Sequence, residues 1–259
     1  TVDSWQWDFG DASNSNQQNP THTYTGYGQY GVELIAISNQ GCRDTISQTI
    51  ILHDNPVADF VVPNICQLEP MQYVDNSSIQ EGAITDWNYD LGDLNISSLQ
   101  DPNHTYVIDG SINVTLTVTS DFGCVGASTI PVTVNPKPTA DMLVSNVCLN
   151  DDMNFLDASS ITTGGVVSWE WDFGDTNSSV VQNPTNHYTT SGTFTTELMV
   201  ESDQGCRDTI QQQVEVYQLP VADFNFTSMC LDESATFTDV STSNSGTIDT
   251  WNWNLGDSN

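Results

Sequence analysis

The sequence predicts an all-β protein in which antiparallel β-sandwiches follow one another in a linear array. One observation is a repeat whose motif starts at Trp5, Trp87, Trp169 and Trp251, with the same interval between successive copies. A second is the alternation of apolar and polar residues in short segments that end in turn residues. A third is that no helical period occurs in any copy. Many short strands separated by turns are typical of two packed sheets.

The repeat also sets the domain boundaries. Proline, tyrosine and cysteine landmarks keep the same interval without insertion or deletion, and one interval of chain is the size of a small domain. Prolines at 56, 138 and 220 precede the first strand of a unit, so we expect almost no linker. The predicted units are a partial first repeat at 1–56, complete second and third repeats at 57–138 and 139–220, and a partial fourth repeat at 221–259. Because the sequence starts and stops within a repeat, we expect it to be part of a longer array.

The strands of one unit can be followed in order through the second repeat. Apolar positions predict strands at 57–62, 71–75, 84–92, 112–120 and 125–134. The alternation is clearest in the fourth of these, whose inward positions are Ile112, Val114, Leu116 and Val118. The sequence Asp-Phe-Gly that follows it predicts a tight turn into the last strand.

The repeated motif reads WQWDFGD, WNYDLGD, WEWDFGD and WNWNLGD. Its two aromatic residues are two positions apart and share one strand face, which indicates a core position and not a sugar-binding platform. These structural core residues are Trp5, Trp7, Trp87, Tyr89, Trp169, Trp171, Trp251 and Trp253. The first acid of the motif becomes Asn254 in the fourth copy, which keeps an acceptor and loses the charge, so it cannot be a general acid or base. The second acid follows glycine at the strand end, where a carboxylate can accept turn amides, and the motif is interpreted as a strand-to-turn lock.

The charge excludes several functions. Three basic residues stand against 34 acidic ones, for a net charge of −31, whereas nucleic-acid binding needs a basic surface. Docking on anionic lipid is disfavoured for the same reason. No apolar run approaches the roughly 20 residues of a membrane span.

The sequence predicts no enzyme and no cofactor. His22 and His104 are in register, but Asn186 holds the third position, so no Ser/His/Asp set recurs, and no phosphate-binding or zinc-protease motif occurs. Calcium is a candidate ligand, because hard oxygen ligands suit it. However, no loop concentrates the acids, and no metal site is assigned. The candidate ligands of a structural calcium are the recurring Asp59, Asp75, Asp141, Asp157, Asp223 and Asp239.

Taken together, WEWDFGD, QNPTNHY and GTFTTELMVESDQGC, which recur in each copy, resemble the PKD (polycystic-kidney-disease) domain. The resemblance covers the whole sequence and implies an immunoglobulin-like sandwich. The family usually has glycine after the second acid, where this chain has Ala12, Leu94, Thr176 and Ser258.

Repeats joined through PVADF, with paired cysteines and few basic residues, are most similar to very large surface proteins of gliding and predatory Bacteroidota. That similarity implies adhesins and cell-surface filaments exported by the type IX system. The sequence DTI also resembles a Bacteroidota O-glycosylation acceptor, at Thr45 and Thr209.

Six cysteines beside one lysine predict disulfides and an oxidising compartment, and they lack the spacing of a zinc site. One arrangement pairs Cys66 with Cys124 and Cys148 with Cys206, within repeats. A Cys42–Cys66 bond would be too stretched, because two strands run outward between these residues. In an immunoglobulin-like sandwich the first turn lies where the chain exits and the last hairpin turn where it enters. The resemblance therefore implies that Cys66 faces Cys206 across a junction, and this pairing is favoured while the first stays open.

These features together predict a structural stalk or filament segment of an extracellular, cell-surface adhesive appendage. The expected partners are neighbouring repeats of the same chain, a homo-oligomeric filament, and a target glycan or protein at a tip beyond this sequence. The alternatives are a module that itself binds glycan or protein, and accessory domains of a secreted hydrolase.

Overall fold

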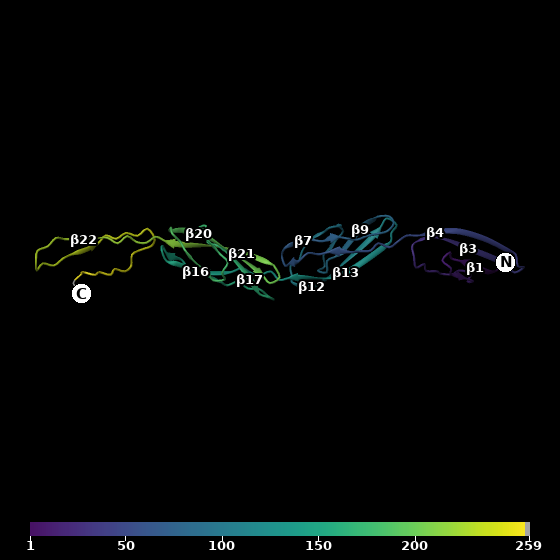
Figure 1. The fold of residues 1–259 in the computed structure, drawn as a ribbon, viewed down its shortest axis with the longest axis horizontal. Helices are drawn as coiled ribbons and strands as arrows, with labels where there is room; N and C mark the ends of the chain where they lie inside the picture. Colours follow the sequence, from purple (N-terminus) through teal and green to yellow (C-terminus); the bar gives the residue numbers. More distant parts are fainter. Residues whose placement is uncertain (257–259) are drawn as a thin grey trace. The chain divides into compact units, whose positions relative to one another are not determined.

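The structure is a computed structural model that describes residues 1–256, and its regular elements are all β-strands (Figure 1). The predicted all-β class with tandem sandwiches is therefore confirmed. The chain divides into two compact units, one at Thr1–Val134 and one that starts at Asn135. Among residues 1–256 no helix is present that has the length and apolar character needed to cross a bilayer.

The second repeat contains a five-stranded sheet in the order β10-β9-β12-β13-β6, with two-stranded sheets β11-β7 and β5-β8. Its strands are β5 (Phe60–Val61), β6 (Ile65–Cys66), β7 (Pro70–Gln72), β8 (Val74–Asp75), β9 (Ile84–Asp90), β10 (Ile96–Ser97), β11 (Asn103–Thr105), β12 (Gly110–Ser120) and β13 (Val125–Asn135). Side chains from all three sheets form one core, in which Tyr73, Tyr89 and Tyr106 are fully buried.

The third repeat has the same plan, with a five-stranded sheet in the order β15-β21-β20-β17-β18 and a three-stranded sheet β14-β16-β19. Its strands are β14 (Met142–Val144), β15 (Val147–Cys148), β16 (Asp152–Asp157), β17 (Val166–Asp172), β18 (Ser178–Ser179), β19 (Thr185–His187), β20 (Gly192–Ser202) and β21 (Arg207–Tyr217). Phe155, Trp171 and Leu198 are at most 1% exposed at the centre of its core.

Long hairpins form the middle of each large sheet (Figure 1). β12 and β13 are paired over ten positions, from Gly110 opposite Val134 to Thr119 opposite Val125. Strand β12 alternates as predicted, with its valines and leucine buried and its threonines outward, because successive strand residues point to opposite faces. The turn closes where the Gly123 N–H donates to the Ser120 carbonyl at 2.9 Å, and Gly123 has a φ of +79°.

The first and fourth repeats hold complementary parts of this plan. The first has a sheet in the order β2-β1-β3-β4, and the described part of the fourth, residues 221–256, has a single pair, β22-β23. Their strands are β1 (Val2–Asp8), β2 (Asn14–Ser15), β3 (Gly28–Ser38), β4 (Arg43–Leu52), β22 (Phe224–Phe226) and β23 (Phe237–Asp239). In the fourth repeat Trp251 and Trp253 are 53% and 41% exposed, whereas Trp171 in the complete third repeat is 1% exposed.

Candidate functional site

The turn that follows the aromatic motif is the most regular polar feature of the molecule. The first acid accepts a hydrogen bond from the glycine N–H two residues later, at 2.9 Å from Gly10 to Asp8 and at 2.8 Å from Gly174 to Asp172. In the fourth repeat Asn254 accepts the same bond from Gly256 at 3.0 Å. An amide oxygen therefore replaces the carboxylate without loss, so this position supplies an acceptor and no catalytic charge.

The glycine of this turn cannot be exchanged for another residue. Gly92 and Gly174 have φ angles of +79° and +75°, and a Cβ atom on either would lie 2.4 Å from a backbone carbonyl oxygen of the neighbouring long strand. Two residues later Leu94 and Thr176 also have positive φ angles, of 74° and 78°. These are positions where the PKD family usually has glycine, and the chain takes the glycine-like conformation there with other residues. Asp257 and Ser258, the fourth copies of the second acid and of this position, lie outside the described residues.

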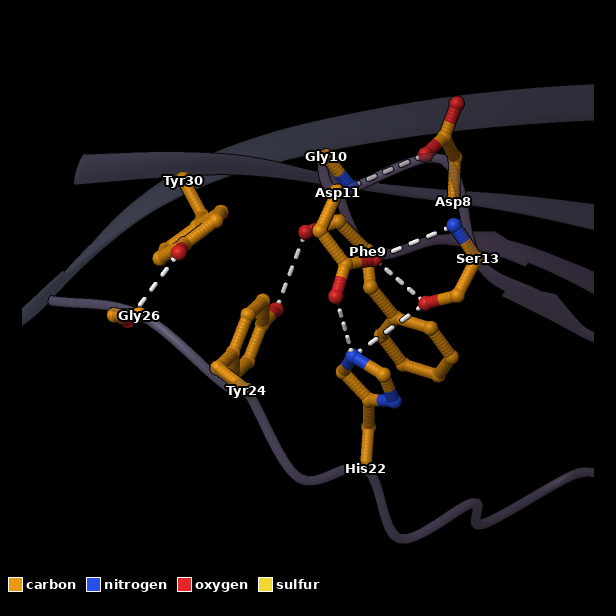
Figure 2. A network of polar contacts seen from close by, with 9 residues as sticks. All are labelled: Asp8, Phe9, Gly10, Asp11, Ser13, His22, Tyr24, Gly26 and Tyr30. Atoms are coloured by element: carbon orange, nitrogen blue, oxygen red, sulfur yellow. Dashed lines mark hydrogen bonds and ion pairs between the residues drawn. The ribbon is translucent and has the colours of Figure 1, made fainter. Parts of the chain in front are cut away.

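The second acid joins the turn to the segment before the long hairpin (Figure 2). In the first repeat Asp11 accepts bonds from the Ser13 side chain, from the Ser13 N–H at 3.0 Å and from His22 Nε2 at 2.7 Å. The Ser13 and His22 hydrogen bonds lower the pKa of Asp11 to about 2. The His22 ring also stacks on Phe9, with 4.3 Å between the ring centroids.

The second and third repeats form the same junction with different partners. Asp93 accepts a bond from His104 Nε2 at 2.7 Å and from the Asn95 N–H at 3.2 Å. Burial raises the pKa of Asp93, but the bonds from His104 and Asn95 outweigh it and hold the pKa below its usual value. In the third repeat Asp175 accepts a bond from Asn186 Nδ2 at 2.8 Å, so a neutral amide takes the place of the imidazole.

A tyrosine closes each turn from the other side. The hydroxyl of Tyr24 donates to the Phe9 carbonyl at 3.0 Å, and Tyr106 and Tyr188 make the equivalent bonds to Leu91 and Phe173 at 2.9 and 3.0 Å. Sequence reasoning placed these tyrosines in register without giving them a role. The available signal was their constant separation from the bonded carbonyl, which is 15 residues in each of the three repeats.

The Ser13, His22 and Asp11 set has the residue types of a hydrolase triad but not its geometry. Ser13 Oγ lies 3.1 Å from His22 Nε2, and Asp11 bonds the same nitrogen. In a triad the carboxylate holds one ring nitrogen so that the other can take the proton of the nucleophile. Here both partners compete for one nitrogen, so the set stabilises the turn and does not activate the serine.

The candidate calcium ligands lie in a second recurring network. Asp75 Oδ2 accepts bonds from Trp87 Nε1 at 2.8 Å and Gln100 Nε2 at 3.0 Å, and Oδ1 accepts the Ser77 N–H at 3.0 Å. Burial raises the pKa of Asp75, and the bonds from Ser77, Gln100 and Trp87 more than reverse this. The first tryptophan of the second motif, Trp87, is only half-buried, and its ring nitrogen is held by an aspartate.

The other copies of this network differ little. Asp157 binds Trp169, Gln182 and Ser159 at 2.8, 3.0 and 3.0 Å, and Asp239 binds Trp251 at 2.8 Å. The recurring glutamine was not singled out from the sequence, although Gln100 and Gln182 keep the interval of the repeat.

The remaining candidates, Asp59, Asp141 and Asp223, each accept the N–H of the following residue through Oδ1, at 2.8 to 3.0 Å. Within the described part of the chain no group of three or more His, Cys, Asp or Glu side chains is arranged to hold a metal ion.

Among the six cysteines, Cys66 and Cys206 are disulfide-bonded. The others are free: Cys42, Cys124, Cys148 and Cys230. The within-repeat arrangement needs Cys124 and Cys148 in bonds, and their free state does not support it. The two predicted glycosylation residues, Thr45 on β4 and Thr209 on β21, are both exposed.

A cavity of about 560 Å³ lies in the fourth repeat, and its lining includes Phe224, Phe237, Trp251 and Trp253. In the third repeat the equivalent side chains, Met142, Phe155, Trp169 and Trp171, lie in one core with residues of β20 and β21. Residues 221–256 contain no counterpart of these two strands. The cavity is therefore an uncovered core and not a binding site formed by convergent polar groups.

The sequence model of the PKD domain family matches residues 1–52, 53–134 and 135–216. The pre-pro-metalloprotease PrtV of Vibrio cholerae serotype O1 is 36% identical over 100 residues, which are 38% of this chain and 11% of that protein. Collagenase ColA of Bacillus cereus is 37% identical over 73 residues, which are 28% of this chain and 8% of that protein. The chain thus spans about a tenth of the length of these curated relatives.

Solved structures of single domains are also similar. The PKD1 domain of the Vibrio cholerae metalloprotease PrtV is 34% identical, with a TM-score of 0.29, and the match covers 31% of this chain and 96% of that one. The PKD1 domain of Vibrio anguillarum Epp is 29% identical, with a TM-score of 0.30, over 32% of this chain and 95% of that one.

Proposed function

Since the chain belongs to the PKD domain family, we propose that it is a structural segment of a stalk or filament in a cell-surface adhesive appendage. The observation that carries the proposal is that every copy uses the same turn to form hydrogen bonds within its own repeat. The same turn recurs with the same hydrogen bonds at Asp8, Asp90, Asp172 and Asn254. The polar side chains of this turn hold strand ends together and do not face a ligand. A load-carrying spacer requires strand ends that are held in this way.

Short connections between repeats support the same function. Within the unit Thr1–Val134 the His53 ring stacks on Phe122 at a centroid distance of 3.6 Å, and Tyr27 donates to Gln80 at 3.3 Å. After the third repeat the Gln218 N–H donates to Ser245 at 3.2 Å. Connections that are bonded in this way leave little free linker and would resist bending between neighbouring domains.

A disulfide between Cys66 and Cys206 is part of the proposal. The bonded state of these two cysteines and the free state of Cys124 and Cys148 support it over the within-repeat pairing. A bond from one repeat to the next would stiffen the array by removing freedom at the junction. Non-reducing peptide mapping is expected to yield one linked peptide that contains Cys66 and Cys206, and a Cys66–Cys124 peptide would reject this pairing.

The proposed location is extracellular, on the cell surface. Disulfide-bonded cysteines and the low lysine content favour an oxidising compartment. We further propose export by the type IX system, which rests only on the resemblance of the repeat sequence to Bacteroidota surface proteins. A glycan or protein target would be bound by another part of the appendage.

The second candidate is an accessory domain of a secreted hydrolase. It is favoured by one observation, which is that the matched relatives are a metalloprotease and collagenases. In that case the chain would present or orient a catalytic domain encoded elsewhere in the same polypeptide.

Immunogold electron microscopy of the native cell surface separates the candidates, with antibodies raised against the chain. A spacer predicts gold particles along surface filaments at many positions in each filament. If the antibodies bind only a protease that is released from the cells, and label no filament, the spacer function is rejected and the accessory role is supported. Binding of the chain on a glycan array would instead indicate that the repeats themselves recognise a ligand.

A further inference from the structure

The cysteines are of two types, which differ in their place within a repeat. An early cysteine lies near the start of a repeat, and a late cysteine follows the turn of the long hairpin. The early ones are Cys66, Cys148 and Cys230, and the late ones are Cys42, Cys124 and Cys206. The disulfide-bonded residues, Cys66 and Cys206, are one of each type. The free cysteines are therefore two early and two late ones.

Each early cysteine begins the same tight turn, whether it is bonded or free. Its carbonyl accepts the N–H of the residue three positions later, at 3.3 Å for Cys66, 3.0 Å for Cys148 and 3.2 Å for Cys230. The residue two positions after the cysteine has a positive φ in all three turns, of 64°, 75° and 68° in the same order. The local backbone thus presents the three sulfur atoms alike.

The late cysteines are also held alike. The N–H of each donates to the serine Oγ four residues earlier, at 3.2 Å for Cys42 and at 3.1 Å for Cys124 and Cys206. The free Cys124 Sγ lies 4.0 Å from the His53 carbonyl oxygen, and the bonded Cys206 Sγ lies 4.0 Å from that of Asn135. A late cysteine therefore contacts the residue that connects its repeat to the preceding one.

An early cysteine lies beside the equivalent connecting residue at the other end of its repeat. Cys148 pairs with Tyr217 in the parallel ladder of β15 and β21, and the Leu149 N–H donates to the Tyr217 carbonyl at 2.8 Å. Tyr217 holds the position of His53 and Asn135. Since a disulfide needs Cα atoms about 4.4–6.8 Å apart, this shared residue is where an early and a late cysteine of consecutive repeats can meet.

The third repeat shows what covers the uncovered core of the fourth. There Phe155 lies in one core with Leu198 of β20 and Val214 of β21. Phe237 holds the position of Phe155 in the fourth repeat and is 39% exposed, whereas Phe155 is 0% exposed. The missing cover is therefore a long hairpin of the β20–β21 kind.

The first repeat has such a hairpin with its inner face open. Leu34 on β3 and Ile50 on β4 hold the positions of Leu198 and Val214. Both are only half-buried, whereas Leu198 and Val214 are 0% and 1% exposed. The lining of a hollow of about 380 Å³ on this face includes Trp7, Leu34 and Ile50. The two partial repeats thus expose opposite sides of the same core.

We propose that the fourth repeat of one copy of this chain binds the first repeat of a second copy, and that two disulfides close the joint. The register pairs Cys148 with Cys42 of the second copy at Tyr217. It also pairs Cys230 with Cys124 of the second copy, beside the second copy's His53. All four free thiols are then used.

Each bond forms when two thiols pass two protons and two electrons to a disulfide oxidant, which is reduced to two thiols. Oxidised glutathione is such an oxidant. The proposal deepens the spacer function and rests on it, since a contact between two different surfaces that does not close into a ring gives an open filament.

Both partial repeats contain the aromatic motif, and the joint has room for one copy. Strand β1 already pairs with β3, from Val2 to Asp8, whereas residues 247–254 form no strand. Strand β1 therefore enters the completed sheet, and Trp5 takes the place of Trp251 at Asp239. The bond of 2.8 Å from Trp251 Nε1 to Asp239 is lost in the joint.

The test is non-reducing electrophoresis and peptide mapping of the full chain in a glutathione redox buffer, with salt that screens the charge. The wild type is expected to form a ladder of dimers, trimers and longer species. Its new linked peptides should be Cys42–Cys148 and Cys124–Cys230.

Two double variants separate this pairing from random oxidation. One is Cys42→Ser with Cys124→Ser, and the other is Cys148→Ser with Cys230→Ser. Each alone is expected to stay monomeric, because it has free thiols of one type only. A mixture of the two should give dimers and no longer species.

A second pair of variants tests the completed core with all thiols present. Phe237→Ala should slow ladder formation by on the order of tenfold, because it removes an apolar contact of the joint. Leu231→Ala, at a position 92% exposed, is the matched control and should leave the rate unchanged. Circular dichroism melting checks that each variant is folded.

Three results would overturn the proposal. One is a wild-type chain that stays monomeric at high concentration. Another is a ladder from either double variant alone, which would show random thiol oxidation. The third is equal rates for Phe237→Ala and Leu231→Ala, which would reject the completed sandwich. The immunogold test is independent of all three, because it locates the chain whether or not copies are joined.

Discussion

The second and third repeats have the same turn, held by different chemistry. In the second, Asp93 is paired with His104, and the hydroxyls of Tyr73 and Tyr106 share a buried hydrogen bond of 2.6 Å. In the third, Asp175 is paired with Asn186. There Phe155 takes the place of Tyr73, and no hydroxyl pair forms at this position. The constant bonds nevertheless match: the glycine bond measures 3.0 and 2.8 Å in the two repeats, and the closing tyrosine bond 2.9 and 3.0 Å.

The comparison shows which parts of the motif determine the fold. Three features are constant: an acceptor at the first acid, glycine two residues after it, and a tyrosine hydroxyl. Each takes part in a bond or contact with the backbone, whose position is set by the strands. The partner of the second acid varies, because a histidine and an asparagine both place an N–H donor at the carboxylate. The turn bonds therefore keep the same lengths although the partner of the second acid differs.

The largest effect is expected from the buried aromatic residue of the motif. Trp171→Ala removes a side chain that is 1% exposed, and Tyr89→Ala removes one that is 0% exposed. Each should lower the free energy of unfolding of its own repeat by about 3–5 kcal/mol. Hydrogen exchange of the amides in β12 and β20 should show the loss in the mutated repeat. Leu143→Ala, at a position 60% exposed, is the control and should change little. Equal loss in both repeats would mean that they do not unfold separately.

The next effect concerns the aspartate that holds the first tryptophan. Asp157→Ala leaves Trp169 Nε1, Gln182 Nε2 and the Ser159 N–H without their acceptor. We expect a loss of about 2–3 kcal/mol from the third repeat, measured by urea unfolding. Asp157→Asn keeps one acceptor oxygen and should recover part of the loss. If Asp157→Ala left the stability unchanged without added metal but abolished a calcium-induced gain, these aspartates would be metal ligands instead.

Sequence predicted the parts of this site that depend on local spacing. The strand faces, the glycine turn and the acceptor role of the two acids follow from neighbouring positions of one short motif. The partners of those residues could not be predicted in the same way. The Tyr106 hydroxyl meets the Leu91 carbonyl, and Asp75 meets Gln100, because separate strands converge in the folded sandwich. A backbone carbonyl acceptor has no residue type of its own, so the constant separation of 15 residues is the only sequence signal for the tyrosine bond.

The pairing of the second acid predicts a difference in acid stability between the repeats. The pKa of Asp93 is lowered in the fold, so its contribution is complete above its unfolded value of about 3.9 and is lost as the pH falls through the folded value. His104→Asn should weaken this dependence in the second repeat, and Asn186→His should make the third repeat more sensitive to acid. The expected change between pH 5 and pH 3 is about 0.5–1 kcal/mol, the range of a solvent-screened pair.

Urea titrations followed by NMR of the β12 and β20 amides would measure this change separately in each repeat. The double variant His104→Asn, Asn186→His is the internal control, because it should exchange the two behaviours. Identical acid profiles for all four proteins would show that the imidazole contributes nothing beyond the hydrogen bond that asparagine also makes.

The smallest effect tests the strained position after the second acid. Leu94 has a φ of 74° and is fully exposed, so its side chain has no packing to lose. A residue with a Cβ pays about 1–2 kcal/mol in the left-handed region, and glycine loses about 0.5–1 kcal/mol more chain entropy on folding. Leu94→Gly should therefore stabilise the second repeat by about 0.5 kcal/mol, whereas Leu94→Ala should change little because it keeps the Cβ. Thr176→Gly should do the same in the third repeat, where φ is 78°. A destabilisation by either glycine, read from the urea midpoint at constant slope, would mean that Leu94 and Thr176 make contacts that outweigh the strain.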